Sequence, residues 1–448
     1  MNEHAKQSPS TIIIVGGGTA GWMSANLMAH AWPGSRITVV ESSDISPIGV
    51  GEGSTPYLKL FFQKLDIPES EWMPQCDATY KCGIKFTQWS TNKGFERYFH
   101  PFFSPLDIEP ASGFFKNCTQ RRRGYNINAH PDNYFVSTAM SRHNKAPHPY
   151  KTLPFDVDYG YHFDAGLLGS FLKKKAIEKK VTHVIDHIEL VEVQHQKIVS
   201  LKGRVNDEMN ADLFVDCSGF SSRLINKALN EPLISYNETL LNDRAVAIST
   251  HPKFQELPSS TVSAALNHGW CWHIPLQSRT GHGYVYSSEF LEPEQAEQEL
   301  RMVLGDDAIN QPARHLKMQL GRINHHWKSN CLAVGLSQGF VEPLEATALM
   351  TIQITIESFI AHYCDNDLKE QQRQKFNLKI NRILDGVRDY ISMHYKLNTR
   401  NDTPYWQAAR NDIKISDSVR VLKDAWFNGN DFERALCPIN PFLGETTK

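Results

Sequence analysis

The chain has 448 residues, of which 41% are hydrophobic and 21% are charged, and its formal net charge is -2. This composition is typical of a globular enzyme and excludes a disordered or fibrous protein. The densest basic runs, 121–123 and 173–175, are short enough to be solvated surface, so no nucleic-acid partner is predicted.

The eight cysteines are scattered, and no two of them form a CxxC pair. We expect reduced thiols, and we predict no metal site. The apolar run 11–15 is too short to be a signal sequence or a membrane span. A cytosolic, cytoplasmic location without membrane contact is therefore expected.

The chain opens with the pattern of a βαβ unit. Residues 11–15 (TIIIV) are β-branched and apolar, which predicts a buried parallel strand, and they run directly into Gly16-Gly17-Gly18. A helix is expected from about 21 to 30, followed by a second strand at 36–41 that ends on an acidic residue. This order predicts the first unit of an α/β fold.

Further along, the periodicity changes twice. Short alternating runs between about 150 and 290 predict a second, mostly antiparallel layer. The clearest of these runs are 181–185, 198–205 and 284–288. Residues 211–219 form a buried strand that we expect to return to the first sheet. From 349 to about 395 the apolar residues have helical spacing, so the C-terminal third is predicted to be mainly helical.

A dinucleotide fingerprint follows the first strand. In Gly16-x-Gly18-x-x-Gly21, backbone amides and the helix dipole can hold a pyrophosphate without a cationic side chain. Glu41 comes twenty residues after Gly21 and can accept hydrogen bonds from a ribose diol. The predicted cofactor contacts in this region are Gly16, Gly18, Thr19, Ala20, Gly21 and Glu41.

Two more segments favour FAD over NAD. A second glycine-rich stretch, 48–56, contains Gly51 and allows the backbone to approach a flat ring or a phosphate closely. A late strand and glycine-bearing loop at 332–343 contains Leu336 and, by analogy with large flavoenzymes, closes over the ribityl chain. We find no second fingerprint for NAD(P)H, so reduced flavin is expected from a separate reductase.

Four other segments carry a resemblance to one family. They are 80–89 (YKCGIKFTQW), 98–102 (YFHPF), 270–275 (WCWHIP) and 339–348 (GFVEPLEATA). The chain resembles the flavin-dependent tryptophan halogenases and their indole-halogenating relatives, from Thr11 to about Trp406. The resemblance implies an α/β fold in which an FAD-binding Rossmann-like (GR2-type) domain carries an inserted, mostly antiparallel sheet and a helical C-terminal part.

Residues 1–448 are then expected to form one unit with two modules. The FAD-binding module would be built from about 9–60, 211–225 and 320–360. The substrate module would be built from about 70–205, 235–315 and 360–440.

The resemblance also implies a pair of tryptophans beside the flavin and a catalytic lysine that shares a cavity with Glu345, at the far end of a passage leading away from the flavin. Lys81 matches the family's catalytic lysine, which captures hypohalous acid either by a hydrogen bond or as a chloramine. Lys85 is its nearest rival, expected on the same strand face. Trp270 and Trp272 match the tryptophans that shield the flavin from organic substrates, although a packed aromatic strand would look the same.

At the far end of the site the resemblance implies an acid, a halide site and a substrate clamp. Glu345 matches the glutamate that works beside the lysine and accepts the proton lost by the ring. Thr347 and Ala348 match the halide-binding pair, and His100 and Phe102 match the pair that sandwiches the substrate indole. The pattern departs at two positions: Ala346 replaces a serine and Ala348 replaces a glycine, which leaves the choice between chloride and bromide open.

The expected activity is halogenation of an aromatic, indole-type small molecule with reduced FAD, O2 and chloride or bromide. The late tyrosine and glutamate that hold free tryptophan in the family have no match here, so indole, a substituted indole or a carrier-held arene is expected instead. Two alternatives remain: a flavin monooxygenase that hydroxylates its substrate, and a flavin-binding protein without catalysis. The oligomeric state is open, with a homodimer among the options.

Overall fold

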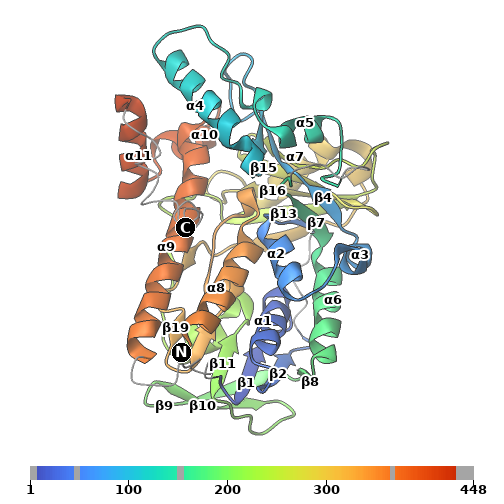
Figure 1. Ribbon diagram of the computed structural model, residues 1–448, viewed down its shortest axis with the longest axis vertical. Helices are drawn as coiled ribbons and strands as arrows, with labels where there is room; N and C mark the ends of the chain where they lie inside the picture. Colours follow the sequence, from blue (N-terminus) through green and yellow to red (C-terminus); the bar gives the residue numbers. More distant parts are fainter. Residues whose placement is uncertain (1–7, 45–50, 149–155, 364–368, 430–448) are drawn as a thin grey trace.

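The computed structural model describes residues 8–44, 51–148, 156–363 and 369–429. A parallel sheet occupies the lower half of the view in Figure 1, and a larger antiparallel sheet lies in the upper half. The orange helices of the C-terminal part run alongside the parallel sheet.

The parallel sheet has six strands and is the nucleotide-binding sheet that the sequence predicts. In spatial order the strands are β19 (Trp327–Lys328), β20 (Cys331–Ala333), β11 (Leu213–Asp216), β1 (Thr11–Val15), β2 (Arg36–Glu41) and β8 (Thr182–Ile185). Every pairing is parallel except that of β19 with β20. The two N-terminal strands and the return of residues 211–219 as β11 are confirmed.

One strand was assigned to the wrong layer. Residues 182–185 form β8, which pairs in parallel with β2, so this run does not belong to the antiparallel layer. Local alternation indicates a half-buried strand but does not encode its partner.

The helix after the glycine turn lies in the middle of the molecule. Helix α1 (Thr19–Ala31) begins two residues earlier than predicted, and all its residues from Gly21 to Met28 are buried. It packs against α6 (Ala165–Glu178) and α8 (Ala348–His362). Because it is covered on both sides, its first turn is held firmly against the end of β1.

The antiparallel layer is a seven-stranded sheet. In spatial order its strands are β17 (Arg314–Lys317), β13 (Arg244–Thr250), β16 (Thr280–Tyr286), β15 (Gly269–Pro275), β14 (Thr261–Ala265), β5 (Gly83–Thr87) and β6 (Arg97–Pro101). Only β14 and β5 are parallel. The mostly antiparallel layer is confirmed, but it includes two strands from before residue 150. The predicted run 198–205 is instead β10 (Lys197–Gly203), in a hairpin with β9 (Ile188–Gln194).

Two small sheets connect these layers. One consists of β3 (Gly51–Gly53), β7 (Gly160–Asp164) and β4 (Thr79–Lys81), and the other of β12 (Ile234–Ser235), β18 (Gly321–Arg322) and β21 (Gly339–Phe340). The first of them brings the glycine-rich stretch and the predicted active-site lysine onto one sheet. The division into two modules stays a prediction.

The C-terminal part is helical, as predicted. The remaining helices are α2 (Tyr57–Lys64), α3 (Glu69–Trp72), α4 (Ile108–Arg122), α5 (Val136–Arg142), α7 (Pro293–Leu304), α9 (Lys369–Leu397), α10 (Pro404–Asn411) and α11 (Asp417–Asn428). Along α9 the buried residues recur every three or four positions, so one face of this long helix packs on the core.

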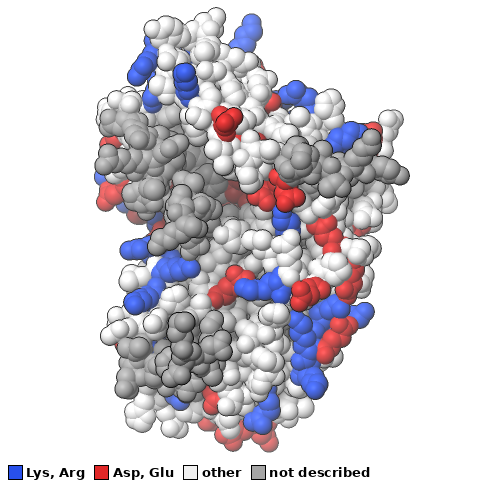
Figure 2. All heavy atoms as spheres, viewed as in Figure 1, with Lys and Arg blue, Asp and Glu red and all other residues white. Residues whose placement is uncertain are grey.

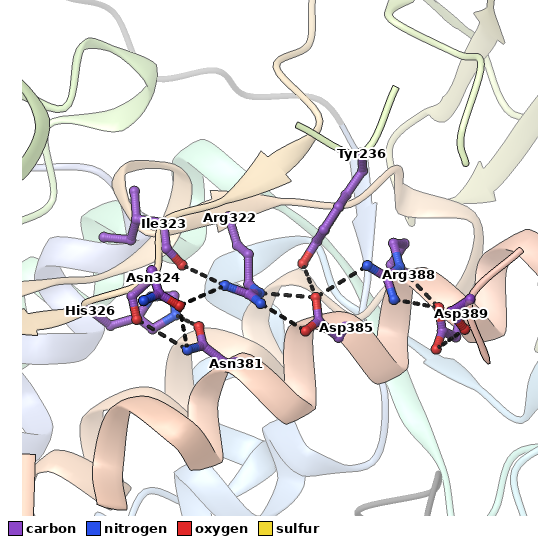
Figure 3. A network of polar contacts seen from close by, with 10 residues as sticks. Tyr236, Arg322, Ile323, Asn324, His326, Asn381, Asp385, Arg388 and Asp389 are labelled. Carbon is purple, nitrogen blue, oxygen red and sulfur yellow. Dashed lines mark hydrogen bonds and ion pairs between the residues drawn. The ribbon is translucent and has the colours of Figure 1, made fainter. Parts of the chain in front are cut away.

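A polar network fixes α9 against the strands beneath it (Figure 3). Asp385 accepts hydrogen bonds from Arg322 Nε at 2.9 Å and from Tyr236 Oη at 2.8 Å. One turn later, Arg388 pairs with Asp389 at 2.7 Å. A bidentate arginine–carboxylate pair has a strict geometry, so this network sets the rotation of α9 just before Tyr390.

No helix among the described residues is long and apolar enough to cross a membrane. Within the described ranges, no group of three or more His, Cys, Asp or Glu side chains is arranged to hold a metal ion. On the face shown in Figure 2, acidic and basic side chains are mixed.

Candidate active site

The glycine turn after β1 is shaped by close backbone contacts. Gly16 has a φ of 119°, and a Cβ there would lie 2.2 Å from the carbonyl oxygen of Cys217. A Cβ on Gly21 would lie 1.9 Å from the carbonyl oxygen of Gly16. Both positions therefore require glycine, one for backbone conformation and both for the approach of the helix to the strand.

The N-terminus of α1, which follows this turn, suits a pyrophosphate. Gly18 is the N-cap of α1 and offers no side-chain acceptor, and the first turn carries no acidic residue. A Cβ on Gly18 would meet no atom of the described residues within 4 Å, so the space beside Gly18 is open in this part of the chain. Helix amides without a side-chain partner at an open turn are the donors that an anionic group needs.

Glu41 is at the end of β2, beside the same turn. A Cβ on Gly17 would lie 2.3 Å from Glu41 Cδ, so the carboxyl group is packed directly against the glycine backbone. His183 on β8 contacts its Oε2 at 2.8 Å. The carboxylate is thus oriented at the edge of the turn, where a ribose would lie. These residues fit FAD.

The other two predicted flavin segments lie near this turn and near β15. Leu336 follows β20 in a short 3₁₀ turn, where a Cβ on Gly335 would be 2.8 Å from Ala20 Cβ. Gly51 is buried, and a Cβ on it would lie 3.6 Å from Ile274 at the end of β15. Residues 48–50 of the glycine-rich stretch lie outside the described residues.

Trp270 and Trp272 are buried on β15, with ring centroids 6.0 Å apart. Gly283 on the neighbouring strand leaves room for Trp272, since a Cβ there would lie 1.9 Å from its ring. The pair thus forms a fixed aromatic wall, and its role in shielding the flavin stays a prediction.

Lys81, the last residue of β4, is fully buried, and its Nζ has no hydrogen-bond partner among the described residues. The Nζ lies 3.1 Å from the Cβ position of Gly53 and 5.5 Å from the centroid of the Phe102 ring. Burial lowers the pKa of Lys81 to about 8, and the negative charge of Glu345 opposes part of that shift.

The rival lysine is in a different environment. Lys85 is exposed and lies on β5, whereas Lys81 lies on β4. The prediction that both share one strand face was wrong, because the chain changes strand at Cys82 and enters the seven-stranded sheet at Gly83.

Glu345 ends a short 3₁₀ turn and is followed by Ala346 in the left-handed region, with a φ of 55°. Its Oε2 is 3.1 Å from His100 Nδ1, and its Oε1 is 3.0 Å from His394 Nε2. Burial alone would raise the pKa of Glu345, but these two histidines outweigh it and hold the pKa below its ordinary value. Burial alone would lower the pKa of His100, yet the Glu345 carboxylate raises it.

Two residues of this cluster were missed at the level of sequence. His394 and Tyr390 lie one turn apart on α9, and the Tyr390 hydroxyl is 2.9 Å from His100 Nε2. Their four-residue spacing on a predicted helix indicates a shared face. That spacing was the only available signal, and it does not say which face meets Glu345.

The predicted substrate residues contact Glu345 or Lys81, and the predicted halide residues follow Glu345 in the chain. His100 on β6 is bonded to Glu345, while Phe102, just beyond the strand, lies near Lys81. Thr347 is the N-cap of α8 and Ala348 its first residue, and no side chain caps that end. The electrostatic influence of Glu345 on Lys81 joins the two remote segments, whereas a passage from them to the flavin stays a prediction.

An aromatic pocket of about 430 Å³ opens beside this cluster. Tyr98, Tyr390 and His394 line it, together with Trp89 and Phe95. No Asp, Glu, Lys or Arg is among the described residues that line it. Lys81, Glu345, His100 and Phe102 are not among the described residues that line it, so its use by the substrate stays a prediction.

The family model described as tryptophan halogenase matches residues 11–436. The chain belongs to the tryptophan halogenase family. It is 35% identical to tryptophan 6-halogenase SttH of Streptomyces toxytricini, over 94% of this chain and 84% of that protein. It is 38% identical to 7-chloro-L-tryptophan 6-halogenase KtzR of Kutzneria sp. (strain 744), over 93% and 84% of the two chains.

Solved halogenase structures have the same fold. The crystal structure of SttH superposes with a TM-score of 0.85 at 34% identity, covering 94% of this chain and 85% of that one. BrvH, a flavin-dependent halogenase from Brevundimonas sp. BAL3, gives a TM-score of 0.82 at 31% identity, over 93% and 84% of the two chains. The protein is a flavin-dependent halogenase of the tryptophan halogenase family that uses FAD and halide and acts on an aromatic substrate.

Proposed function

We propose that this enzyme halogenates an uncharged, indole-type arene, with Lys81 delivering the halogen and Glu345 accepting the ring proton. The observation that carries the proposal is the cluster itself. Lys81 and Glu345 are both buried; His100 Nδ1 lies 3.1 Å from Glu345 Oε2, and the ring centroid of Phe102, two residues further on, lies 5.5 Å from Lys81 Nζ. Two buried ionisable groups are costly to place together and are typical of a catalytic site.

FAD would be held by the glycine turn, with its pyrophosphate on the amides at Gly18 and Thr19 and a ribose on Glu41. When bound and reduced, it would supply hypohalous acid from O2 and halide. The single nucleotide fingerprint supports delivery of reduced flavin by a separate reductase. The open N-terminus of α8 at Thr347 and Ala348 supports a halide site there.

Lys81 can deliver the halogen in either of two ways, by a hydrogen bond or as a haloamine. As an ammonium it donates a hydrogen bond to hypohalous acid and directs the halogen to the substrate. As a neutral amine it forms a haloamine with release of water, and the later transfer of halogen to the ring restores the amine. A lysine pKa near 8 makes both forms accessible at neutral pH.

Glu345 can complete the substitution. When the ring carbon gains halogen it must lose a proton, and an ionised carboxylate is the acceptor that this step requires. The contacts to His100 and His394 hold the pKa of Glu345 below its ordinary value, which favours the ionised carboxylate, and the hydrogen bond with His100 orients its Oε2. The net reaction converts the arene and hypohalous acid into haloarene and water.

The substrate is proposed to be an arene that carries no charged substituent. The described residues that line the pocket beside Tyr390 and His394 include no Asp, Glu, Lys or Arg, which supports a substrate without the charges of a zwitterionic amino acid. Indole or a substituted indole fits this chemistry better than free tryptophan does.

Product analysis tests the proposal. The enzyme is incubated with FAD, a flavin reductase, NADH, bromide or chloride, and a panel of indoles that includes free tryptophan. Mass spectrometry should show a haloindole whose formation requires halide. A hydroxylated product formed without halide would instead indicate a monooxygenase, and the absence of product from every arene would indicate a flavin-binding protein without catalysis. Preference for free tryptophan over neutral indoles would contradict the substrate class.

A further inference from the structure

A buried histidine that the halogenation steps do not use lies beside the lysine. His162 on β7 is fully buried. Its Nδ1 is 3.0 Å from Thr79 Oγ1 on β4, and its Nε2 is 2.9 Å from Thr261 Oγ1 on β14. The Thr79 hydroxyl in turn donates to the carbonyl oxygen of Pro275, at 2.8 Å. Four strands thus meet in one chain of hydrogen bonds.

The direction of every hydrogen bond in this chain follows from its fixed end. The Pro275 carbonyl can only accept, so the single hydroxyl proton of Thr79 is used there. Thr79 must then accept from Nδ1–H of His162. Burial and the nearby charge of Lys81 lower the pKa of His162 well below its ordinary value, so the ring is neutral and its Nε2 is an acceptor. The Thr261 hydroxyl therefore donates to Nε2, and its own lone pairs stay free.

Those lone pairs lie near the lysine. The Cβ position of Gly53 is 3.1 Å from Lys81 Nζ and 3.6 Å from Thr261 Oγ1, so amine and hydroxyl approach the same point. Both side chains are buried, and within the described part of the chain Lys81 Nζ has no hydrogen-bond partner. A buried ammonium gains most from an acceptor that is already oriented.

We propose that Thr79, His162 and Thr261 form a relay of fixed polarity that offers Thr261 Oγ1 as an acceptor to the Lys81 ammonium through one bridging water. Thr261 is then a positioning residue for the lysine, and His162 acts through it. Because the relay starts at Pro275, it also couples the lysine to the end of β15, the strand that carries Trp270. The inference rests on the proposed role of Lys81, but the protonation of that amine can be measured without turnover.

The test is the titration of Lys81 in the full-length protein, with and without FAD. The ¹³Cε resonance is followed by NMR in protein labelled with ¹³C-lysine and is assigned by its loss in Lys81→Arg. Thr261→Val removes the acceptor at nearly constant volume and should lower the Lys81 pKa by about 0.5–1 pH unit. Thr261→Ser keeps the hydroxyl and should titrate like the unmodified protein.

His162→Phe is the second test. Without Nε2, the Thr261 hydroxyl proton loses its acceptor and becomes free to point at the amine, so the Lys81 pKa should fall as well. Ser263→Ala is the matched control, because Ser263 is a buried hydroxyl on the same strand with no partner of its own.

A Lys81 titration that is unchanged in both folded variants would overturn the relay. An equal shift in Ser263→Ala would also overturn it, because the effect would then reflect general loosening of β14. The result is independent of whether the enzyme forms a haloindole, so failure of the relay and failure of the proposed function are separate outcomes.

Discussion

His394 Nε2 lies 3.0 Å from Oε1 of Glu345, while His100 Nδ1 lies 3.1 Å from Oε2. The carboxylate is therefore contacted through both oxygens, one by a helix and the other by an edge strand. A base that must stay ionised while buried needs such partners, because desolvation alone would favour its protonated form.

Replacing His394 with Leu should slow halogenation about 10- to 100-fold while leaving FAD binding unchanged, since one oxygen of the base loses its partner. Tyr390→Phe is the milder comparison: it removes only the hydroxyl 2.9 Å from His100 Nε2 and should cost about two- to tenfold. Initial rates of haloindole formation at saturating reduced flavin measure both. Full activity in His394→Leu would show that the contact has no catalytic role.

Burial of Lys81 should lower the free energy of unfolding of the protein at neutral pH. The pKa of Lys81 is about 8 in the folded protein and about 10.5 when unfolded, so between these values the unfolded chain binds more protons and native stability rises with pH. Lys81→Met should therefore be more stable than the unmodified protein at pH 7, on the order of 3 kcal/mol, and the gain should shrink toward pH 10. Urea unfolding at pH 7 and pH 10 checks this. A gain that does not vary with pH would contradict it.

The pH profile of halogenation should show a limb centred near pH 8, from the titration of Lys81. Activity that falls above this pH indicates that the ammonium is the working form and donates a hydrogen bond. Activity that rises indicates the neutral amine and therefore a haloamine. Initial rates from pH 6.5 to 9.5 with a constant supply of reduced flavin give the answer, and a flat profile across that interval would contradict the lysine assignment.

Gly53→Ala should displace the lysine without unfolding the protein. The new Cβ would lie 3.1 Å from Nζ, and the flexible end of the lysine would move instead of the backbone. A shift of this kind at a reacting group can cost about 100-fold in rate. Gly113→Ala is the matched control, because a Cβ there meets no atom within 4 Å. Halogenation rates and FAD absorbance of the two variants are compared, and equal rates would show that the lysine tolerates the displacement.

The sequence was most informative where structure is local. The strand at 11–15, the glycine turn and the helix after it follow from β-branched residues, Gly16, Gly21 and helical spacing, and all three are present. The run 182–185 was read as a strand but placed in the wrong layer, because its partner β2 is far away in the chain.

In the candidate site, too, the sequence did not predict the features that depend on contacts between distant segments. In one continuous strand, Lys81 and Lys85 would point to the same face. The change of strand at Cys82 separates their environments, so that Lys81 is buried and Lys85 is exposed. The place of His394 in the site could not be predicted from the sequence, because its contact with Glu345 depends on the rotation of α9. The network around Asp385 sets that rotation (Figure 3).

The central claim is that a halogen passes from the flavin side of the enzyme to an arene through Lys81. The most direct measurement compares Lys81→Met with Lys85→Met for haloindole formation under the same supply of reduced flavin and bromide. The account predicts that Lys81→Met binds FAD, consumes O2 and yields no haloindole above the enzyme-free background, while the exposed Lys85→Met variant retains its activity. Haloindole formation at the normal rate by Lys81→Met would contradict it.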